Sequence, residues 1–574
     1  SNYKAEYDQI SSAAVTAVTR SGTNEFSGSF YWDHTSDNWR KPTPQEEIGG
    51  KARENTEQYG VAFGGPIIRD KLHFFLTYEA KDFIVPRFVA APSNITEAMT
   101  LPSRITQYYG PASQPFNQKV YFGKLSYSAN ESNLFELTAK YRDEVGVLDV
   151  GNDRRIESAG TGLVNDETRI DLRHQFSSMN WLNDAHVTYE KSAYNPSPVT
   201  PGPGNRYTVI NPNQTDPTRN TVVLWTGSGP NGQDKGQKGW AVQDELTFFG
   251  WEGHTLKMGV KYKQVDLNAF QFFPPFPQYF YDVFDTVDQP YQLQFGAVRP
   301  GRNPYVTSSN RQFGIYLQDD WQASDKLTLN LGVRWDYERN PSYEDNVLNA
   351  GIATALRAWP NIRNTDYNIN DYISTGNNRS SFKDAIQPRL GFSYDLFGDQ
   401  RHVFFGGAGR AYDRNIFDYM AREFYSGATT TVTLNFLTPM HPCSGSRPAC
   451  VPWNPAFLTP EGIAAYAAAN PQGTQSEVFL INNDIKTPNS DQFSLGMRNI
   501  FALWGHDWNS SVAVSHIRSY DGIYFRNGRR RPDGSFHQFE SQGQTWGGGP
   551  GDNVPGVGGL LLGDNGFEYR STSL

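Results

Sequence analysis

The most constraining feature of this sequence is a strict alternation of apolar and polar residues. Between residues 327 and 337 every second residue is apolar, and those between them are Thr328, Asn330, Gly332, Arg334 and Asp336. Side chains on a β-strand point alternately to its two faces, so this stretch predicts a strand with one apolar and one mostly polar face. A tilted strand crosses a bilayer in about 9–11 residues, so this stretch is long enough to span one.

The same alternation recurs at residues 72–79, 135–142 and 256–263. The third stretch places Lys257, Lys261 and Lys263 on one face. Unpaired charges are costly in a dry core, whereas a water-filled lumen tolerates them. The solvent-facing side of a soluble sheet tolerates them as well, so this strand alone leaves both interpretations open.

The connections between the predicted strands alternate between short and long. Short turns are predicted at residues 69–71, 130–133, 177–180, 250–253, 323–326, 397–401 and 502–506. Long polar segments lie at residues 34–56, 83–116, 144–166, 192–236, 268–310, 340–387, 413–485 and 519–566. Outer-membrane barrels have short periplasmic turns and long external loops. The pattern therefore predicts an all-β transmembrane antiparallel β-barrel, with about fifteen strands from Phe26 and the start of another near Phe567.

The composition is compatible with such a barrel. Hydrophobic residues make up 37% of the chain and the mean hydropathy is −0.60, values typical of a soluble protein. A barrel strand that alternates between apolar and polar residues also averages out as polar. No run of about 18 apolar residues occurs, so no transmembrane helix is expected. The net charge of −9 argues against nucleic acid as a partner.

Five tryptophans lie beside the predicted short turns. They are Trp181, Trp251, Trp321, Trp504 and Trp508. In a barrel all five fall at the same end, and indole rings favour the headgroup level of a membrane. They are therefore candidates for an aromatic girdle at the periplasmic interface. Ordinary packing at strand ends explains the same pattern, and the sequence leaves both explanations open.

Four segments, in order along the chain, resemble TonB-dependent outer-membrane receptors of the Oar-like subgroup. They are 5–7 (AEY) followed by 15–29 (VTAVTRSGTNEFSGS), 63–75 (FGGPIIRDKLHFF), 316–321 (YLQDDW) continuing into 327–337, and 388–395 (PRLGFSYD) with 406–409 (GGAG). The first resembles the last plug strand and its junction with the barrel, although residues 11–14 read SSAA where the subgroup is usually glycine-rich. The second resembles an early periplasmic hairpin turn.

This resemblance implies a plug domain inside a barrel of about 22 strands. On that basis residues 1–25 are expected to be the C-terminal end of the plug, and residues 26–574 an incomplete β-barrel. The chain starts without a signal peptide and ends at residues 570–574 as a strand begins, so further sequence is expected on both sides. The resemblance also implies a bacterial outer-membrane location, contact with lipid and lipopolysaccharide, and a TonB system acting through a segment that precedes Ser1.

Two groups of residues are candidate functional or stabilising positions. Cys443 and Cys450 lie in one predicted loop, and an exported protein meets an oxidising environment. A disulfide between them is expected, with two free thiols as the alternative. The candidate lumen-lining residues are Lys257, Lys261, Lys263 and Arg334. The three lysines either line a ligand path, pair with plug carboxylates or simply keep the lumen wet, and the last interpretation is favoured.

Three other features lie in the predicted long loops. Arg526 and residues 529–531 either bind lipopolysaccharide phosphates or an anionic ligand, or form a solvated charge run, and the solvated run is favoured. The aromatic segment 270–281 either forms a ligand-binding mouth or packs the loops on each other. The glycine-rich segment 547–559 is expected to be a flexible loop, because no phosphate-binding Gly-Lys-Ser/Thr motif follows it.

The resemblance and the strand pattern together predict TonB-dependent transport of a ligand that is captured by the long loops and passed through a plugged barrel. An adhesion or protein-export role within the same family is one alternative. A secreted all-β carbohydrate-binding protein is another, and it predicts no apolar belt. Neither a His-Glu-x-x-His nor a Gly-x-Ser-x-Gly motif occurs, so no enzyme activity, cofactor or metal site is predicted.

Overall fold

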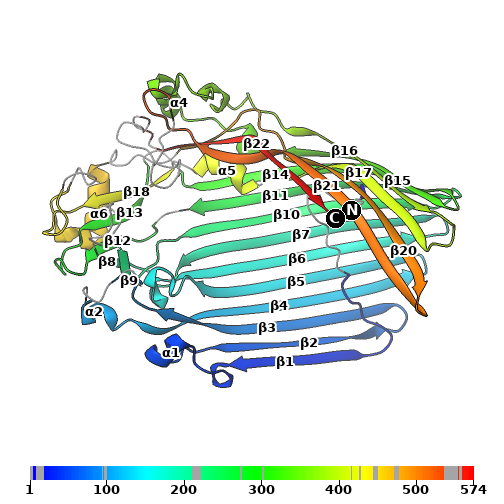
Figure 1. Cartoon of the computed structure of the whole chain (residues 1–574), viewed down its shortest axis with the longest axis horizontal. Coiled ribbons are helices and arrows are strands. Elements are labelled where there is room, and N and C mark those ends of the chain that lie inside the picture. The colour runs from blue at the N-terminus through cyan, green and yellow to red at the C-terminus, as the bar shows by residue number, and fades with distance from the viewer. Residues whose placement is uncertain are drawn as a thin grey trace.

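The structure is a computed structural model, and strands make up most of it (Figure 1). The structure describes residues 4–7, 18–93, 95, 100–209, 221–271, 274–299, 303–414, 417–425, 428–443, 450–470, 478–535, 554, 557 and 559–574. In this part of the chain no helix combines the length and the apolar character that crossing a bilayer requires. Most of the glycine-rich segment 547–559, and residues 11–14 before the predicted plug strand, lie outside these ranges.

Seventeen strands form one large sheet. They are β1 (Ser27–Ser36), β2 (Asn55–Ile68), β3 (Leu72–Val89), β4 (Gly110–Asn130), β5 (Asn133–Leu148), β6 (Thr161–Ser177), β7 (Trp181–Pro198), β10 (Gln233–Phe248), β11 (His254–Gln271), β14 (Tyr305–Ser324), β15 (Leu327–Arg339), β16 (Phe382–Asp395), β17 (His402–Tyr412), β19 (Val478–Ile481), β20 (Asn489–Leu503), β21 (His506–Asn527) and β22 (Leu560–Ser573). With β19 left out, each strand from β1 to β21 pairs antiparallel with the following strand of this sheet, so that β17 pairs with β20. Without the short parallel strand β19, the sheet has sixteen strands. This number confirms the prediction of about fifteen strands and the start of another.

The last strand is longer than the sequence pattern predicts. β22 begins at Leu560, well before Phe567, and pairs antiparallel with β21. On its other side, residues Leu560 to Gly563 pair parallel with β19. Leu560 and Leu562 are buried, so this part of the strand is an apolar run without alternation. The prediction of its start was wrong because a run that is covered on both sides lacks a period of two.

The large sheet exposes its apolar face and buries its polar face. On β15 the side chain of Val333 is 45% exposed, whereas that of the adjacent Arg334 is 3% exposed. Asp336 is buried on the same face as Arg334, and Leu331 is exposed on the same face as Val333. A soluble sheet has the opposite distribution, because burying a charge costs free energy and burying an apolar side chain gains it. We call the apolar side the outer face and the polar side the inner face.

The short and the long connections lie at opposite ends of the large sheet (Figure 1). The short turns join β2 to β3, β4 to β5, β6 to β7, β10 to β11, β14 to β15, β16 to β17 and β20 to β21. In the last of these, Trp504 and Gly505 both have positive φ angles, 54° and 75°, as a tight two-residue hairpin requires. We call the end with the short turns the turn end and the end with the long connections the loop end. This separation confirms the asymmetry that the sequence predicts.

A second, five-stranded sheet lies at the loop end (Figure 1). Its strands are β8 (Gly204–Val209), β9 (Thr221–Gly227), β12 (Gln278–Asp282), β13 (Gln292–Val298) and β18 (Thr429–Asn435). They come from three different long connections, and β8 pairs parallel with β12 while the other pairs are antiparallel. Tyr279 is buried in its core with Leu293 and Phe436. At least one aromatic residue of segment 270–281, Tyr279, therefore packs the long connections against each other.

Within the described residues, every helix lies in a long connection. They are α1 (Pro44–Gly49), α2 (Ser103–Thr106), α3 (Pro341–Glu344), α4 (Ala350–Ala358), α5 (Phe417–Tyr425) and α6 (Pro460–Ala469), with 3-10 turns η1 (Asp37–Trp39), η2 (Asn152–Arg154), η3 (Glu157–Ala159), η4 (Pro360–Ile362), η5 (Ile369–Asp371) and η6 (Pro455–Leu458). α1 begins with a capping box between Thr43 and Glu46. Ala421 of α5 packs against Leu267 and Val306, so α5 covers the inner face of β11 and β14 near the loop end.

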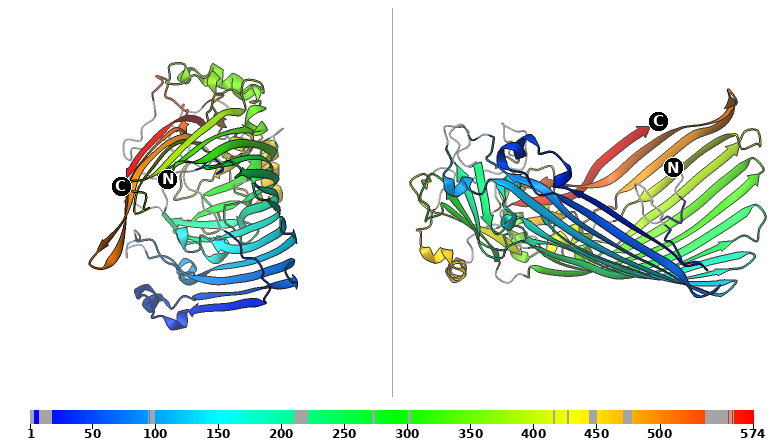
Figure 2. Two further views of the ribbon diagram at one scale, coloured as in Figure 1. Left: turned by 90° about the vertical axis from the view of Figure 1, so that its right-hand side faces the viewer. Right: turned by 90° about the horizontal axis from the view of Figure 1, so that it is seen from below.

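The large sheet curves into an open trough (Figure 2). β1 forms one edge, and β21 and β22 lie at the other. The trough encloses the polar inner face, and the apolar outer face is on its convex side. The curvature therefore brings the inner-face side chains of distant strands toward a common space.

Candidate functional site: the inner face

A network of ion pairs covers the inner face of β4 to β7. Glu136 of β5 lies 2.8 Å from Lys124 of β4 and 3.0 Å from Arg173 of β6. Arg173 also binds Asp184 of β7 through two hydrogen bonds, of 2.7 and 2.5 Å. His186 lies 3.1 Å from Asp184 and continues the network along β7. These residues share one face because alternate residues of paired strands point to the same side, so each strand adds one charged group to the row.

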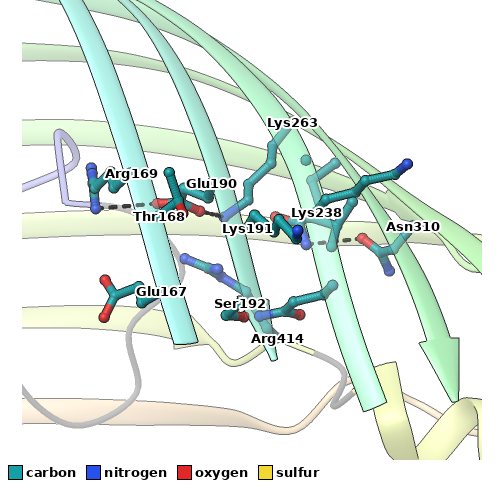
Figure 3. Close-up of a pocket in the computed structure, with 14 residues that line it drawn as sticks. Glu167, Thr168, Arg169, Glu190, Lys191, Ser192, Lys238, Lys263, Asn310 and Arg414 are labelled. Atoms are coloured by element: carbon teal, nitrogen blue, oxygen red, sulfur yellow. Dashed lines mark hydrogen bonds and ion pairs between the residues drawn. The ribbon is translucent and has the colours of Figure 1, made fainter. Parts of the chain in front are cut away.

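The network continues around a pocket on the inner face (Figure 3). Lys263 of β11 reaches Glu190 of β7 at 2.8 Å, and Arg169 of β6 approaches the same carboxylate at 3.1 Å. The pocket has a volume of about 410 Å³, and Asn310 and Gln312 of β14 complete this side of it. Its lining combines cations, carboxylates and amides, so it is suited to a polar ligand or to ordered water.

The described N-terminal residues 4–7 bind to the inner face close to the turn end. The ammonium of Lys4 lies 2.6 Å from Asp320, and the backbone N–H of Ala5 donates to the side-chain carbonyl of Gln318 at 2.9 Å. Glu6 forms an ion pair with Lys257 of β11. Ala5 is fully buried.

A second set of contacts fixes the same segment from β15 and β16. Arg389 of β16 donates to the backbone carbonyl of Lys4 at 2.9 Å and to that of Tyr7 at 3.4 Å. On β15, a side chain at Gly332 would place its Cβ 2.9 Å from the Cβ of Ala5. The absence of a side chain at Gly332 therefore allows the segment to lie directly against the sheet. Four strands, β11, β14, β15 and β16, thus hold these residues.

The four predicted lumen residues all lie on the inner face, but their partners differ. Lys257 pairs with Glu6 of the N-terminal segment, and Lys263 pairs with Glu190 of the wall. Arg334 lies 2.7 Å from Asp336 on its own strand. Lys261 lies between Lys257 and Lys263 on the same face of β11. Lys257 thus contacts an N-terminal carboxylate and Lys263 lines the pocket, and the three interpretations of the lysines stay predictions.

Sequence reasoning missed Gln318, Asp320 and Arg389 as contacts of the N-terminal segment. The alternation places Gln318 and Asp320 on the inner face, opposite the apolar Leu317. It places Arg389 on the same face as Gln387, whose amide donates to Asp336. The period of two thus identified the face on which each residue lies. It did not identify their partners in the N-terminal segment, which lie more than three hundred positions away in the sequence.

At the loop end, Cys443 and Cys450 are joined by a disulfide, with their Cα atoms 5.7 Å apart. Residues 444–449 between them lie outside the described residues. Cys450 forms a β-bridge with Asn435, the last residue of β18. The disulfide therefore connects the segment after β18 to the edge of the five-stranded sheet.

The arginine cluster near the end of β21 is neither a solvated run nor a free anion site. Arg530 is 1% exposed, and its guanidinium donates to Asp366 at 2.8 Å. Arg526 donates to the same carboxylate at 2.8 Å, and both guanidinium groups lie over the ring of Tyr367, 5.0 and 5.1 Å from its centroid. The favoured prediction of a solvated charge run was wrong for these two residues, because a distant loop supplies the carboxylate and the aromatic ring.

Two rows of aromatic residues lie on the outer face. The five predicted tryptophans are all exposed and lie at the turn end, where Trp181 packs on Phe248 with ring centroids 4.4 Å apart. A second row, nearer the loop end, was not predicted. It includes Tyr78, Tyr121 and Tyr141 on neighbouring strands, with successive centroids 5.0 and 6.1 Å apart, and the pair Tyr189–Trp240 at 4.8 Å. The sequence contained enough information to predict this second row, because tyrosines recur on the apolar face of successive predicted strands.

In the part of the chain that the structure describes, no group of three or more His, Cys, Asp or Glu side chains is arranged to hold a metal ion. Some of the buried charges of the inner face are paired with one another, as in Arg334 and Asp336. Such pairing offsets part of the free-energy cost of burying each charge.

Comparisons with known proteins agree with this architecture. A family model described as an outer membrane beta barrel domain matches residues 18–100 and 84–502. The TonB-dependent transporter Oar from Myxococcus xanthus is 28% identical over 152 residues, which cover 23% of this chain and 14% of that protein.

Two solved structures share the fold. The outer membrane transporter YddB from Escherichia coli aligns with a TM-score of 0.57 at 11% identity, over 96% of this chain and 55% of that one. A ferric enterobactin receptor from Pseudomonas aeruginosa aligns with a TM-score of 0.50 at 14% identity, over 96% of this chain and 59% of that one. This chain therefore spans little more than half the length of these structures, and a much smaller share of the curated relative.

The exposed apolar belt, the buried polar face and the separation of turns from loops are the features of a protein that spans a bilayer with strands. They argue against a secreted soluble β-protein, and they agree with the family match across most of the sequence. The chain belongs to the outer-membrane β-barrel family and is a protein of the bacterial outer membrane.

Proposed function

We propose that this chain is part of a TonB-dependent transporter, in which residues 1–25 end the plug and residues 26–574 form most of the barrel. In this proposal the loop end is external and captures a ligand, and the plug moves to open a path along the inner face. The activity is transport and not catalysis. The observation that carries the proposal is the attachment of residues 4–7 to the inner face at the turn end.

The chemistry of this attachment suits a plug that moves. Its ion pairs, Lys4 with Asp320 and Lys257 with Glu6, are partly exposed rather than buried. Partly exposed pairs contribute about 0–1 kcal/mol each, so together they position the segment without locking it. A mechanical pull transmitted from an inner-membrane complex can therefore release it. A large apolar interface in the same place would resist such a pull, because burial contributes about 25 cal/mol per Å².

Two further observations support transport. The relative from Myxococcus xanthus is named a TonB-dependent transporter, and the first solved structure is named an outer membrane transporter. The inner face of this chain carries a polar pocket of about 410 Å³ between the loop end and the N-terminal segment. A polar ligand released from the loops would meet this surface next. The proposed partners are a TonB system, outer-membrane lipid with lipopolysaccharide, and a ligand of polar character.

The proposal is tested by labelling a cysteine at position 5 in cells that make the full-length protein. Ala5 is fully buried against the inner face, so Ala5→Cys is expected to be protected from a membrane-impermeant maleimide when the plug is at rest. Cells with an active TonB system should label it several-fold faster than cells that lack TonB or are treated with a protonophore. Equal labelling in all three conditions would refute TonB-driven plug movement. Cys443 and Cys450 are disulfide-bonded and do not compete for the reagent.

A further inference from the structure

The outer face of the large sheet carries an acidic residue inside its apolar belt. Asp244 of β10 is exposed and shares the outer face with Val242 and Leu246, the residues two positions before and after it. Its direct neighbours across the two adjacent strands are Ala185 of β7 and Val260 of β11. Apolar side chains therefore surround this carboxylate on all four sides within the plane of the sheet.

Asp244 lies midway between the two aromatic rows of the outer face. Trp240, four residues before it, belongs to the row near the loop end and packs on Tyr189. Phe248, four residues after it, belongs to the row at the turn end and packs on Trp181. Four strand residues span about 13 Å, so each headgroup region lies roughly that far along the strand from Asp244. The carboxylate thus lies at the level of the centre of the hydrocarbon layer.

Only one polar side chain meets this carboxylate within the described part of the chain. The amide of Asn183 on β7 donates to Oδ1 of Asp244 at 2.6 Å, and it also donates to the backbone carbonyl of Glu245 at 3.2 Å. The other oxygen, Oδ2, has no hydrogen-bond or ion-pair partner among the residues that the structure describes. An ionised carboxylate in contact with hydrocarbon is costly unless a charge or several hydrogen bonds compensate it, and one amide supplies only part of that compensation.

A groove lies beside the carboxylate on the same face. It has a volume of about 520 Å³, and its lining includes Asp244 together with the apolar residues Met258, Val260, Ile315, Leu317 and Val333. All five of these apolar side chains are exposed. The groove thus combines apolar side chains with the carboxylate of Asp244. Arg334 also contributes to its lining, but its guanidinium is paired with Asp336 on the inner face. Within a membrane, polar side chains of this kind serve as contacts between membrane-embedded proteins.

We propose that Asp244 and the groove beside it form a docking site for a membrane-embedded segment of another protein that carries a lysine or arginine. We infer this occupant from charge complementarity, because a lysine or arginine side chain would compensate the carboxylate of Asp244. A second copy of the chain related by a two-fold axis would bring two carboxylates together, and like charges repel strongly in a low-dielectric medium. A lipid molecule carries its charge at the interface, about 13 Å along the strand from this carboxylate. A cation within a protein segment satisfies Oδ2 at the required depth.

The test uses the intact protein in phosphatidylcholine vesicles, with an acceptor dye on Glu252→Cys in the turn after β10. The probes are two fluorescent polyleucine helices, one with a single central lysine and one with leucine at that position. Energy transfer should show that the lysine helix binds at least ten-fold more tightly than the leucine helix. Asp244→Asn, which keeps the shape and the bond from Asn183, should abolish this preference. Asp143→Asn, which removes a carboxylate two positions beyond Tyr141 and outside the belt, should retain it.

Three results would overturn the proposal. The first is equal binding of the two helices, and the second is an unchanged preference in Asp244→Asn. The third is self-association of the protein that requires Asp244, measured by energy transfer between two labelled populations, because it would identify a second copy as the occupant. Heat-modifiable gel migration of each variant shows whether it is folded. Asp244→Asn is expected to fold at least as well as the parent, since it removes a charge from the lipid-facing surface.

Discussion

The ammonium of Lys4 lies 2.6 Å from the carboxylate of Asp320, so one of the first described residues of the chain is tied to β14, more than three hundred positions away. Together with the pair between Lys257 and Glu6, this contact attaches the N-terminal segment to the wall through charged side chains. The strength of the attachment is therefore accessible to single substitutions on the barrel.

Removing the ammonium of Lys257 should loosen the N-terminal segment. The side chain is 28% exposed, so the pair with Glu6 contributes about 0.2–1 kcal/mol, equivalent to a change of about 1.4- to five-fold in the population of released segment. Lys257→Ala should raise the frequency of ion-conducting openings in planar bilayers by about that factor. Lys263→Ala is the matched control, because Lys263 lies on the same face of β11 but pairs with Glu190. Equal effects of the two variants would contradict a specific role for Lys257.

Charge on the two faces of β15 should have opposite consequences for stability. Val333→Arg places a cation on the lipid-facing side and should lower the free energy of unfolding by about 2–4 kcal/mol. Arg334→Leu leaves the buried carboxylate of Asp336 without its ion-pair partner and should cost about 3–5 kcal/mol. Denaturant unfolding in lipid vesicles measures both values, and Val333→Leu serves as the neutral control. A stable Arg334→Leu protein would show that the inner-face pair is dispensable.

Reduction of the disulfide should destabilise the connection after β18 without unfolding the barrel. The bridge closes a loop with a sequence separation of 7, and restricting the unfolded chain in this way is worth about 2–3 kcal/mol. Cys443→Ser with Cys450→Ser should therefore speed proteolysis between Thr438 and Trp453. Heat-modifiable migration of the barrel should be unchanged. Unaltered cleavage kinetics would show that the packing around Phe436 holds this segment without the bridge.

The contact between Asp366 and the arginines should be sensitive to acid. Burial raises the pKa of Asp366, but the hydrogen bond from Arg530 and the charges of Arg530 and Arg526 outweigh this effect and hold the pKa below its usual range. A lowered pKa means that the contact contributes its full stability above about pH 4, the ordinary value for aspartate, and loses it as the pH falls through the lower value of the folded state.

Hydrogen exchange of the backbone around residues 360–373 measures this loss. Protection should be constant between pH 5 and 8 after correction for the intrinsic exchange rate, and should fall below about pH 4. Asp366→Asn should show reduced protection at every pH, with no further acid-dependent step. An acid-dependent step of the same size in Asp366→Asn would assign the effect to another group.

The sequence predicted those parts of the fold that depend on a local period, and it missed those that depend on distant partners. The alternation at residues 327–337 predicted β15 and its two faces, because the period of two is a property of neighbouring residues. The five-stranded sheet was not predicted, since its short strands come from three separate connections and pair only in space.

The same distinction applies to the candidate site. Lys257 was identified from its strand pattern, but its partner Glu6 lies far away in the sequence and only the structure brings them together. The prediction for Arg530 was wrong for the same reason, because its partners also lie far away in the sequence. A run of arginines resembles a solvated patch when its own segment is considered alone, whereas Asp366 and Tyr367 of another loop surround it.

The central claim is that the apolar face of the large sheet meets lipid and the polar face is enclosed. A scan of nitroxide spin labels along β15 in vesicles tests it most directly, with collision rates measured for molecular oxygen and for a water-soluble nickel complex. Labels at positions 331, 333 and 335 should favour oxygen, and labels at positions 332, 334 and 336 should not, giving a period of two. A pattern without this period, or one in which Val333 favours the nickel complex and Arg334 favours oxygen, would contradict the account.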